Sequence, residues 1–303
     1  MDAETYARHV AHNDPEREYM LAGDHLNETQ FPRGGLSVDS DADSAMGDID
    51  GAPSTSSLRS SIYQYVEEYG RTFHKYKQGS KCVCVCVCVC ELALLRVATE
   101  HPSAHVIGTD LSPIQPEYVP ANCHFEVDDA DDDWIFSHPF DYIHLRMIFH
   151  SFRSHKEVMR SGFENLLPGG WIEYQDYYCH LQSVDGTLQG TALERWSQLY
   201  VEGGLRLGRD MLAPRKYKQW MEETGYVNVT EQKLVIPGNP WPKGHDLKLL
   251  GAWQMANFLE GIHAVTMTIF TRGLGMSSEE VELLLVDVRK DIKNLGVHFY
   301  FLT

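Results

Sequence analysis

The chain has 303 residues, a formal net charge of −17 and a hydrophobic content of 43%. This apolar fraction is large enough to build a folded interior. The negative charge disfavours direct nucleic-acid binding, which needs a basic face. No run approaches the roughly 18 apolar residues of a membrane span, and the first residues do not resemble a secretory signal. We therefore expect an intracellular protein, cytoplasmic or nuclear, that does not bind membranes.

The first part of the chain differs in composition from the rest. Residues 39–61 are acidic, rich in serine and nearly free of large apolar side chains. Such a segment does not bury enough surface to offset its loss of conformational entropy. We predict a disordered acidic tail over residues 1–58 and a folded domain over residues 59–303. The alternative is an arm that folds on a protein partner.

The domain is predicted to begin with a helix. Apolar residues from Ile62 to Phe73 recur at helical spacing, and Ser60 or Ser61 is available as an N-cap. The next segment, Cys82–Cys90, alternates cysteine and valine, a period typical of an extended strand. Residues 91–100 are helix-like, and Pro102 should end that helix.

The following segments predict an α/β fold, because short apolar strands alternate with helical stretches. The predicted strands are Val106–Thr109, Phe125–Val127, Phe140–Leu145 and Trp171–Gln175. A helix over His155–Leu167 and a turn at Pro168–Gly170 precede the last of these. The rest is predicted as mainly helical over Leu188–Gly225, extended over Val227–Ile236, helical over Leu247–Ile269 and Ser278–Leu295, and extended over Val297–Thr303.

Acidic residues follow two of the predicted strands. Asp110 ends the strand of VIGTD, where a carboxylate can accept hydrogen bonds from both hydroxyls of a ribose. The run FEVDDADDDW places Asp128 and Asp129 at the end of the next strand, where an acid can accept from an adenine amino group. The alternatives are a turn-capping aspartate and an acidic turn that starts a helix.

Several segments together resemble the fungal LaeA-like methyltransferases, which depend on S-adenosylmethionine (SAM). The similarity extends from about residue 60 to the end and is carried by SSIYQYVEEYGRTFHKYKQG, EHPSAHVIGTDLSPIQPEYVPANCHFEVDDADDDW, FDYIHLRMIFHSF, LLPGGWIEYQD and LGMSSEEVELLLVDVRKDIKNLGVHFYF. The resemblance implies a Rossmann-like class I sheet with helices on both faces. It also implies that the cofactor-binding residues are Asp110, Leu111, Asp128, Asp129, Ala130 and Arg146. Arg146 would line the methyl side of the cofactor; a surface arginine paired with acids is the alternative.

The chain departs from this family where the cofactor loop should be. Members carry a first strand and a loop resembling DIGTGTGIW, whereas residues 80–101 contain no glycine. Glycine lets the backbone approach the ligand and turn into a helix, which β-branched valine resists. We therefore expect a defective first strand and weak or lost SAM binding. We also expect a defective final strand, because the chain stops inside what resembles the last strand.

Three interpretations of the sequence remain open. The first is a SAM-dependent methyltransferase with an unknown acceptor, possible protein partners and a role in regulating fungal secondary metabolism. The second is a catalytically inactive interaction or regulatory protein on the same scaffold. The third is an incomplete gene model, since a repeated TG dinucleotide encodes alternating Cys and Val.

Other candidate chemistry has weaker support. The alternating thiols could ligate a soft metal, but no second Cys/His cluster completes a tetrahedral site, so we expect no metal. His144, His150 and His155 lie near the end of the strand at Phe140–Leu145 and are candidate bases, although packed or surface histidines are more common there. No catalytic residue is assigned.

Overall fold

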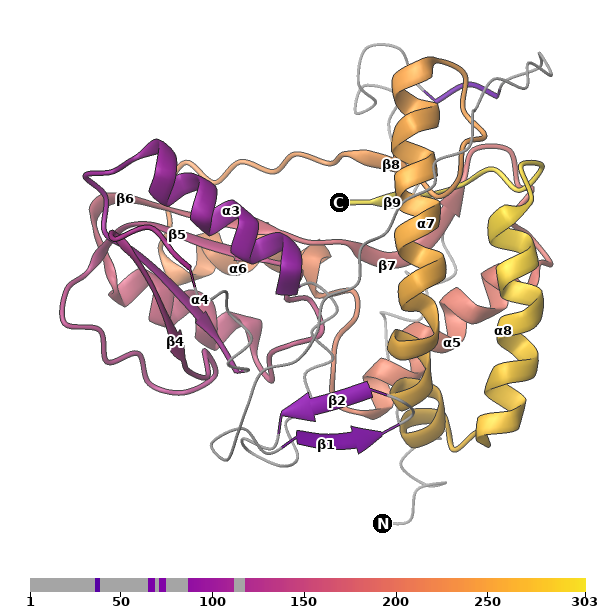
Figure 1. The fold of residues 1–303 in the computed structure, drawn as a ribbon, viewed down its shortest axis with the longest axis horizontal. Coiled ribbons are helices and arrows are strands. Elements are labelled where there is room, and N and C mark those ends of the chain that lie inside the picture. Colours follow the sequence, from indigo (N-terminus) through magenta and orange to yellow (C-terminus); the bar gives the residue numbers. More distant parts are fainter. Residues whose placement is uncertain (1–35, 39–64, 69–70, 75–86, 112–117) are drawn as a thin grey trace. The chain divides into compact units, whose positions relative to one another are not determined.

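The computed structural model describes residues 36–38, 65–68, 71–74, 87–111 and 118–303 (Figure 1). These residues all belong to one compact unit, residues 36–303. The tail predicted over residues 1–58 lies outside the described residues except for Leu36–Val38. There Val38 forms an isolated antiparallel bridge with Pro242, and the amide of Lys243 donates to the carbonyl of Ser37 at 2.8 Å.

The first described elements form an antiparallel hairpin, not the predicted helix. Strand β1 (Tyr65–Glu68) pairs with β2 (Arg71–His74), with Tyr65 opposite His74. The segment is rich in aromatic and β-branched residues, which favour strands, and this preference outweighed the helical spacing of its apolar side chains. The helix prediction was therefore wrong here.

The second half of the Cys-Val run is helical. Helix α3 (Val87–Glu100) includes its last four residues, so the extended strand expected there is wrong, while Cys82–Cys86 lie outside the described residues. Valine and cysteine lose only a few tenths of a kcal/mol in a helix, so packing of the following turns decides the outcome. Those turns are anchored by Ala98, which is 1% exposed. The helix ends before Pro102, as predicted.

Two parallel strand pairs follow, as the sequence predicted. Strand β3 (Val106–Asp110) pairs with β4 (Cys123–Val127), and β5 (Phe140–Arg146) pairs with β6 (Leu166–Gln175). Helix α4 (His155–Glu164) connects β5 to β6. Among the described residues no strand joins the two pairs, and residues 75–86, where the first strand was expected to be defective, lie outside the described residues.

Close packing holds α3 on its strand pair. A Cβ on Gly108 would lie 2.6 Å from the ring of Phe125 and 2.8 Å from Leu94, so only glycine fits between strand and helix. The side-chain amide of Asn122 donates to the carbonyls of Ala98 and His101 at 3.0 and 3.1 Å. These contacts tie the end of the helix to the start of β4.

The sequence predicted a turn between helix and strand at Pro168–Gly170. In the structure these residues instead form a bulge inside β6. The register passes from Phe140 opposite Leu166 to Tyr142 opposite Trp171, so extra residues are accommodated on β6. Gly169 takes a φ of +86°, which glycine adopts without strain.

The last strand is well formed, which corrects the expectation of a defective one. Strand β9 (Phe299–Leu302) lies between β7 (Tyr178–Ser183) and β8 (Val235–Pro237) and is antiparallel to both. Its four side chains are all buried, and it has a paired strand on each side, with a register shift in the pairing with β7 between Tyr178 and Gln182. Of the extended segment predicted over Val227–Ile236, only Val235 and Ile236 belong to this sheet.

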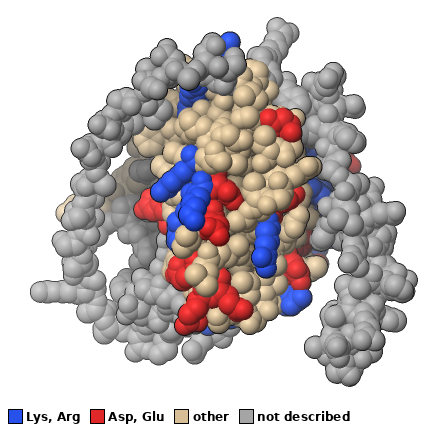
Figure 2. All heavy atoms as spheres, turned by 90° about the vertical axis from the view of Figure 1, so that its right-hand side faces the viewer, with Lys and Arg blue, Asp and Glu red and all other residues tan. Residues whose placement is uncertain are grey.

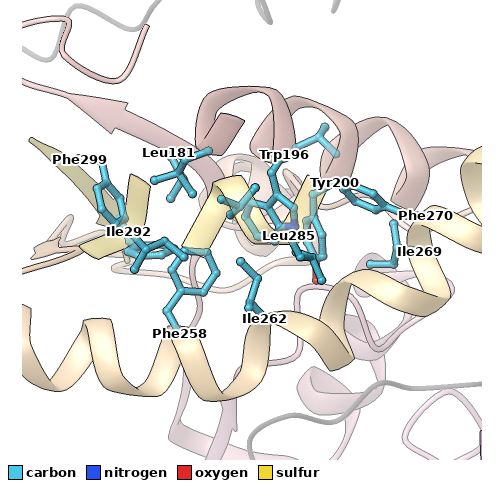
Figure 3. Packing of buried hydrophobic residues seen from close by; sticks show 14 of the residues in the cluster. Leu181, Trp196, Tyr200, Phe258, Ile262, Ile269, Phe270, Leu285, Ile292 and Phe299 are labelled. Carbon is cyan, nitrogen blue, oxygen red and sulfur yellow. The ribbon is translucent and has the colours of Figure 1, made fainter. Parts of the chain in front are cut away.

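The largest core lies between β9 and the helices α5 (Ala192–Arg206), α7 (His245–Thr268) and α8 (Ser278–Lys293). Figure 3 shows Trp196, Ile262, Leu285 and Phe299 converging there. The indole of Trp196 donates to Thr266 Oγ1 at 2.8 Å, so these two buried polar groups are paired with each other. Ser277 and Glu280 form a capping box at the start of α8.

The surface drawn in Figure 2 carries both signs of charge. Basic side chains lie among acidic ones on this face and do not form a basic patch of their own. Individual ion pairs such as Lys290 with Asp287, 2.8 Å apart, are highly exposed and contribute little stability.

Candidate functional site

The carboxyl ends of β3 and β4 bring the predicted nucleoside residues together. Asp110 is the last residue of β3 and pairs with Val127, and its carbonyl accepts a hydrogen bond of 3.1 Å from the amide of Asp128. Both aspartates are half-buried. Leu111 follows at the strand end and is also half-buried, and residues 112–117 lie outside the described residues. The acids therefore share one edge of this strand pair.

The acidic turn after β4 is held by its own side chains. Asp128 accepts from the amide of Asp129 at 2.9 Å, and Asp129 accepts from the amide of Asp131 at 3.0 Å. Asp129 is only 5% exposed. The carbonyl of Ala130 accepts from the indole of Trp134 at 3.1 Å. Asp129 thus shapes the turn, whereas Asp110 and Asp128 are the more accessible carboxylates.

The same turn contacts the second strand pair. The amide of Arg153, in the segment after β5, donates to both carboxylate oxygens of Asp131 at 3.2 and 3.1 Å. Trp134 packs against the cluster of Ile143, Leu145 and Val158, which belong to β5 and α4. The carboxyl ends of both parallel pairs therefore approach each other through residues 128–134.

Arg146 lies at the carboxyl end of β5, as the sequence predicted. It is half-buried and pairs with Gln175 across the strands. Met147 follows with a φ of +57°, an uncommon conformation for a side chain of its size, and its amide donates to the carbonyl of Gln175 at 2.9 Å. The chain turns sharply immediately after Arg146.

A buried polar network stabilises this turn, and it was not predicted from the sequence. One carboxylate oxygen of Asp176 accepts from the amides of Ile148 and Phe149 at 2.7 and 3.2 Å. The other oxygen lies 2.8 Å from the hydroxyl of Tyr217, which lies 3.2 Å from Nδ1 of His155. His155 Nε2 lies 3.0 Å from the carbonyl of Phe149. The contacts form a closed ring.

Burial dominates the acid–base chemistry of this ring. It raises the pKa of Asp176 to about 7, although hydrogen bonds from Tyr217 and two backbone amides act in the opposite direction. It lowers the pKa of His155, against the effect of the Phe149 carbonyl, and it raises the pKa of Tyr217 well above its usual value. Such opposed shifts in neighbouring groups often accompany functional sites.

A sequence signal for Asp176 did exist. It directly follows β6, and Asp110 is the last residue of β3, so the same rule about strand ends applies to both. His155, named as a candidate base, is part of the ring. The other two histidines differ: His144 lies within β5 beside Tyr142, with ring centroids 6.2 Å apart, and His150 is buried against Phe149 at 4.6 Å.

The part of the chain that the structure describes contains neither a metal-ligand cluster nor a membrane-spanning helix. No group of three or more His, Cys, Asp or Glu side chains there could hold a metal ion. Cys123 and Cys179 carry free thiols, and burial raises the pKa of both. None of the described helices combines the length and the apolar character needed to cross a bilayer.

A family model described as a methyltransferase domain matches residues 91–231, a range that begins just after the Cys-Val run and contains both strand pairs. Methyltransferase pytC from Aspergillus terreus is 31% identical to this chain over an alignment 309 residues long. The alignment covers 89% of this chain and 94% of the relative.

Two further relatives match a smaller part of the chain. The probable methyltransferase tdiE from Emericella nidulans is 30% identical over 67% of this chain and 64% of its own length. The secondary metabolism regulator laeA from Monascus pilosus is 30% identical over 67% of this chain, and the chain spans 56% of that relative. The similarity to pytC extends over nearly the whole length of both proteins.

Proposed function

The chain belongs to the SAM-dependent methyltransferases, and on that premise we propose that it binds the adenosine part of the cofactor at the carboxyl ends of β3 and β4. The methyl acceptor is a nucleophile of unknown class. The observation that carries this proposal is the hydrogen bond from Asp128 to the carbonyl of Asp110, which aligns two acidic strand ends on one edge. Two such ends offer acceptors for ribose hydroxyls and for an adenine amino group.

Residues on the adenosine side fit the cofactor. Asp110 and Asp128 remain half-buried and accessible, and Asp129 and Ala130 give the adenine-side turn a fixed shape through bonds to Asp131 and Trp134. We assign Asp110 and Leu111 to the ribose side, and Asp128–Ala130 to the adenine side. Arg146 is proposed to line the methyl side, because the acidic turn contacts the segment after its strand.

Residues on the methionine side fit less well. Residues 80–101 contain no glycine, and α3 begins within the Cys-Val run. A glycine-rich turn onto a helix N-terminus supplies free backbone amides to polar ligand groups. We therefore propose that SAM, which supplies a sulfonium-bound methyl group, binds weakly to this chain, and we derive no catalytic step through it.

This mismatch supports a second candidate function. A chain that keeps the scaffold but not the cofactor loop would act as an interaction or regulatory protein. The similarity to relatives named as secondary metabolism regulators supports such a role, in fungal secondary metabolism. This candidate predicts intact folding together with no measurable SAM binding.

Calorimetric titration with SAM and with S-adenosylhomocysteine tests the proposal. Weak binding that disappears in Asp110→Ala, but persists in the control Asp141→Ala, supports the adenosine site. Asp141 is a suitable control because it is exposed and lies near the amino end of β5. Equal affinity in both variants contradicts the proposed site, and no binding to any of the three proteins favours the second candidate.

A further inference from the structure

The hydrogen-bond ring of Asp176, Tyr217 and His155 constrains where its protons are. A backbone carbonyl only accepts hydrogen bonds, so the 3.0 Å contact of His155 Nε2 with Phe149 requires a hydrogen on Nε2. If His155 is neutral, its Nδ1 is then an acceptor. The hydroxyl of Tyr217, 3.2 Å away, must donate to Nδ1. Tyr217 has no second hydrogen for Asp176.

Burial raises the pKa of Tyr217 well above its usual value and keeps it neutral, and with Tyr217 donating within the ring only two forms satisfy all three contacts. In the first, Asp176 is protonated and donates to Tyr217, which donates to neutral His155. In the second, charged His155 donates to Tyr217, which donates to ionised Asp176. The two forms contain the same number of protons and differ only in where one of them lies. Removing that proton leaves Tyr217 with two acceptors and one hydrogen, and one contact is lost.

The surroundings favour keeping this proton. The site of Asp176 is buried, and its ionisable neighbours Tyr174 and Cys179 have pKa values raised well above their usual values by burial. They stay neutral near pH 7 and do not offset a carboxylate charge. Around His155, Asp210 and Asp131 favour a positive charge and Arg209 opposes it. The carboxylates from neighbouring segments thus favour a proton in the ring.

We propose that Asp176, Tyr217 and His155 share one proton and, through it, position the segment Met147–Phe149 beyond Arg146. The ring contacts this segment on both sides: Asp176 accepts from the amides of Ile148 and Phe149, and His155 Nε2 donates to the carbonyl of Phe149. The relation of the three ring residues to the methyl side of the cofactor rests on the proposed function, so we describe them as positioning residues. The shared proton does not depend on the proposed function.

The variant Asp176→Asn tests proton sharing directly. Its carbonyl can accept from the two amides and its NH₂ group can donate to Tyr217, so it imitates the protonated acid but cannot exchange its proton. In the native protein, the folded ring should hold one proton, which the unfolded chain holds on His155. In the variant, the folded ring should hold no such proton, although the unfolded chain still holds one on His155. The ratio of unfolding constants, native over variant, should therefore rise about tenfold per pH unit from about pH 5 to 7.

Urea unfolding of the protein without cofactor, at half-unit pH steps, measures this ratio. A ratio that does not change with pH overturns the proposal, because an ordinary carboxylate beside a neutral histidine gives native and variant the same proton balance in this range. Asp141→Asn is the matched control: Asp141 is exposed, and the same chemical change there should leave the ratio constant.

Nitrogen-15 NMR of histidine-labelled protein gives a second measurement that needs no variant to fold. We expect His155 to keep a hydrogen on Nε2 between pH 6 and 8, while exposed His138 serves as the reference. A His155 signal that loses the Nε2 hydrogen, or that follows His138 throughout, overturns the proposal. Failure of SAM to bind would affect the proposed function and leave both measurements unchanged.

Discussion

The backbone amide of Asp128 donates to the carbonyl of Asp110 at 3.1 Å, so the segments after β3 and β4 leave the strand pair side by side. This single bond brings together two acids that are 18 positions apart in the sequence. The carboxyl ends of parallel strands are where α/β sheets bind ligands. The proposed adenosine site therefore takes its residues from these strand ends and none from the Cys-Val run.

The cofactor loop provides the first prediction. The chain should bind SAM with a dissociation constant near or above 1 mM, because losing several backbone hydrogen bonds of about 1 kcal/mol each weakens binding by roughly 3 to 5 kcal/mol. Replacing Cys82–Cys90 with the nine residues DIGTGTGIW should tighten binding by at least about tenfold. Calorimetry on both proteins measures the difference.

The matched control is the same nine-residue replacement with its three glycines changed to alanine. It should bind as weakly as the native chain, since only glycine allows the close approach. Low-micromolar affinity of the unmodified chain would contradict the argument from the loop.

The acidic tail provides the second prediction. Residues 1–58 should be removed by limited proteolysis while a resistant fragment remains, because residues 39–61 have few apolar side chains to bury. The bridge of Val38 to Pro242 indicates that part of this tail contacts the domain. Mass spectrometry of the fragments decides the boundary. Protection of the whole N-terminal region would contradict the prediction.

Asn239 provides the third prediction. Its side chain is fully buried, and its amide nitrogen lies 3.1, 3.2 and 3.3 Å from the carbonyls of Ile292, Asn294 and Val297. Asn239→Asp replaces this donor with an acceptor facing three acceptors. We expect a loss of about 3 kcal/mol in the free energy of unfolding at pH 7, measured by urea denaturation.

The control is Asn294→Asp, the same chemical change at an exposed position. The Asn294 side-chain oxygen accepts from the amide of Gly296 at 2.9 Å, and a carboxylate can do the same. Its effect should stay within about 0.5 kcal/mol. Similar losses in the two variants would show that the carbonyl cluster around Asn239 is not the cause.

The sequence predicted those parts of the fold in which local signals agree. Strands β3 to β5 are short apolar runs with polar ends, and α8 has both an N-cap and apolar spacing, so propensity and packing indicate the same structure. The acids at the ends of β3 and β4 were predicted for the same reason. The pocket roles of Asp110 and Asp129 remain proposals.

The failures have identifiable physical causes. Residues from Tyr65 to His74 satisfy a helical spacing and a strand propensity at once, and pairing decided between them. In the Cys-Val run the alternation indicated a strand, but the helix that packs through Ala98 extends back into it. The ring around Asp176 joins residues up to 62 positions apart, which no local pattern reveals.

The contact between Asp185 and His298 provides the last prediction, a dependence of stability on pH. Asp185 accepts from His298 Nδ1 at 2.5 Å and from the hydroxyl of Thr187 at 2.8 Å. Partial burial opposes ionisation, but these hydrogen bonds together lower the pKa of Asp185 to about 2 from 3.8. The folded state therefore binds this proton less tightly than the unfolded chain.

The stabilisation is present above pH 4 and disappears as the pH falls through about 2, because protonated Asp185 no longer favours the folded state. Asp185→Asn should thus cost roughly 1 kcal/mol at pH 7, a value reduced for the screening of a partly exposed group, and close to nothing at pH 2. Urea denaturation at both pH values measures the cost. Asp287→Asn, which removes the exposed pair with Lys290, should cost little at either pH. His298 lies just before β9, and Asp185 lies in the loop after β7. An equal cost of Asp185→Asn at pH 7 and pH 2 would mean that the carboxylate charge does not hold these two segments together.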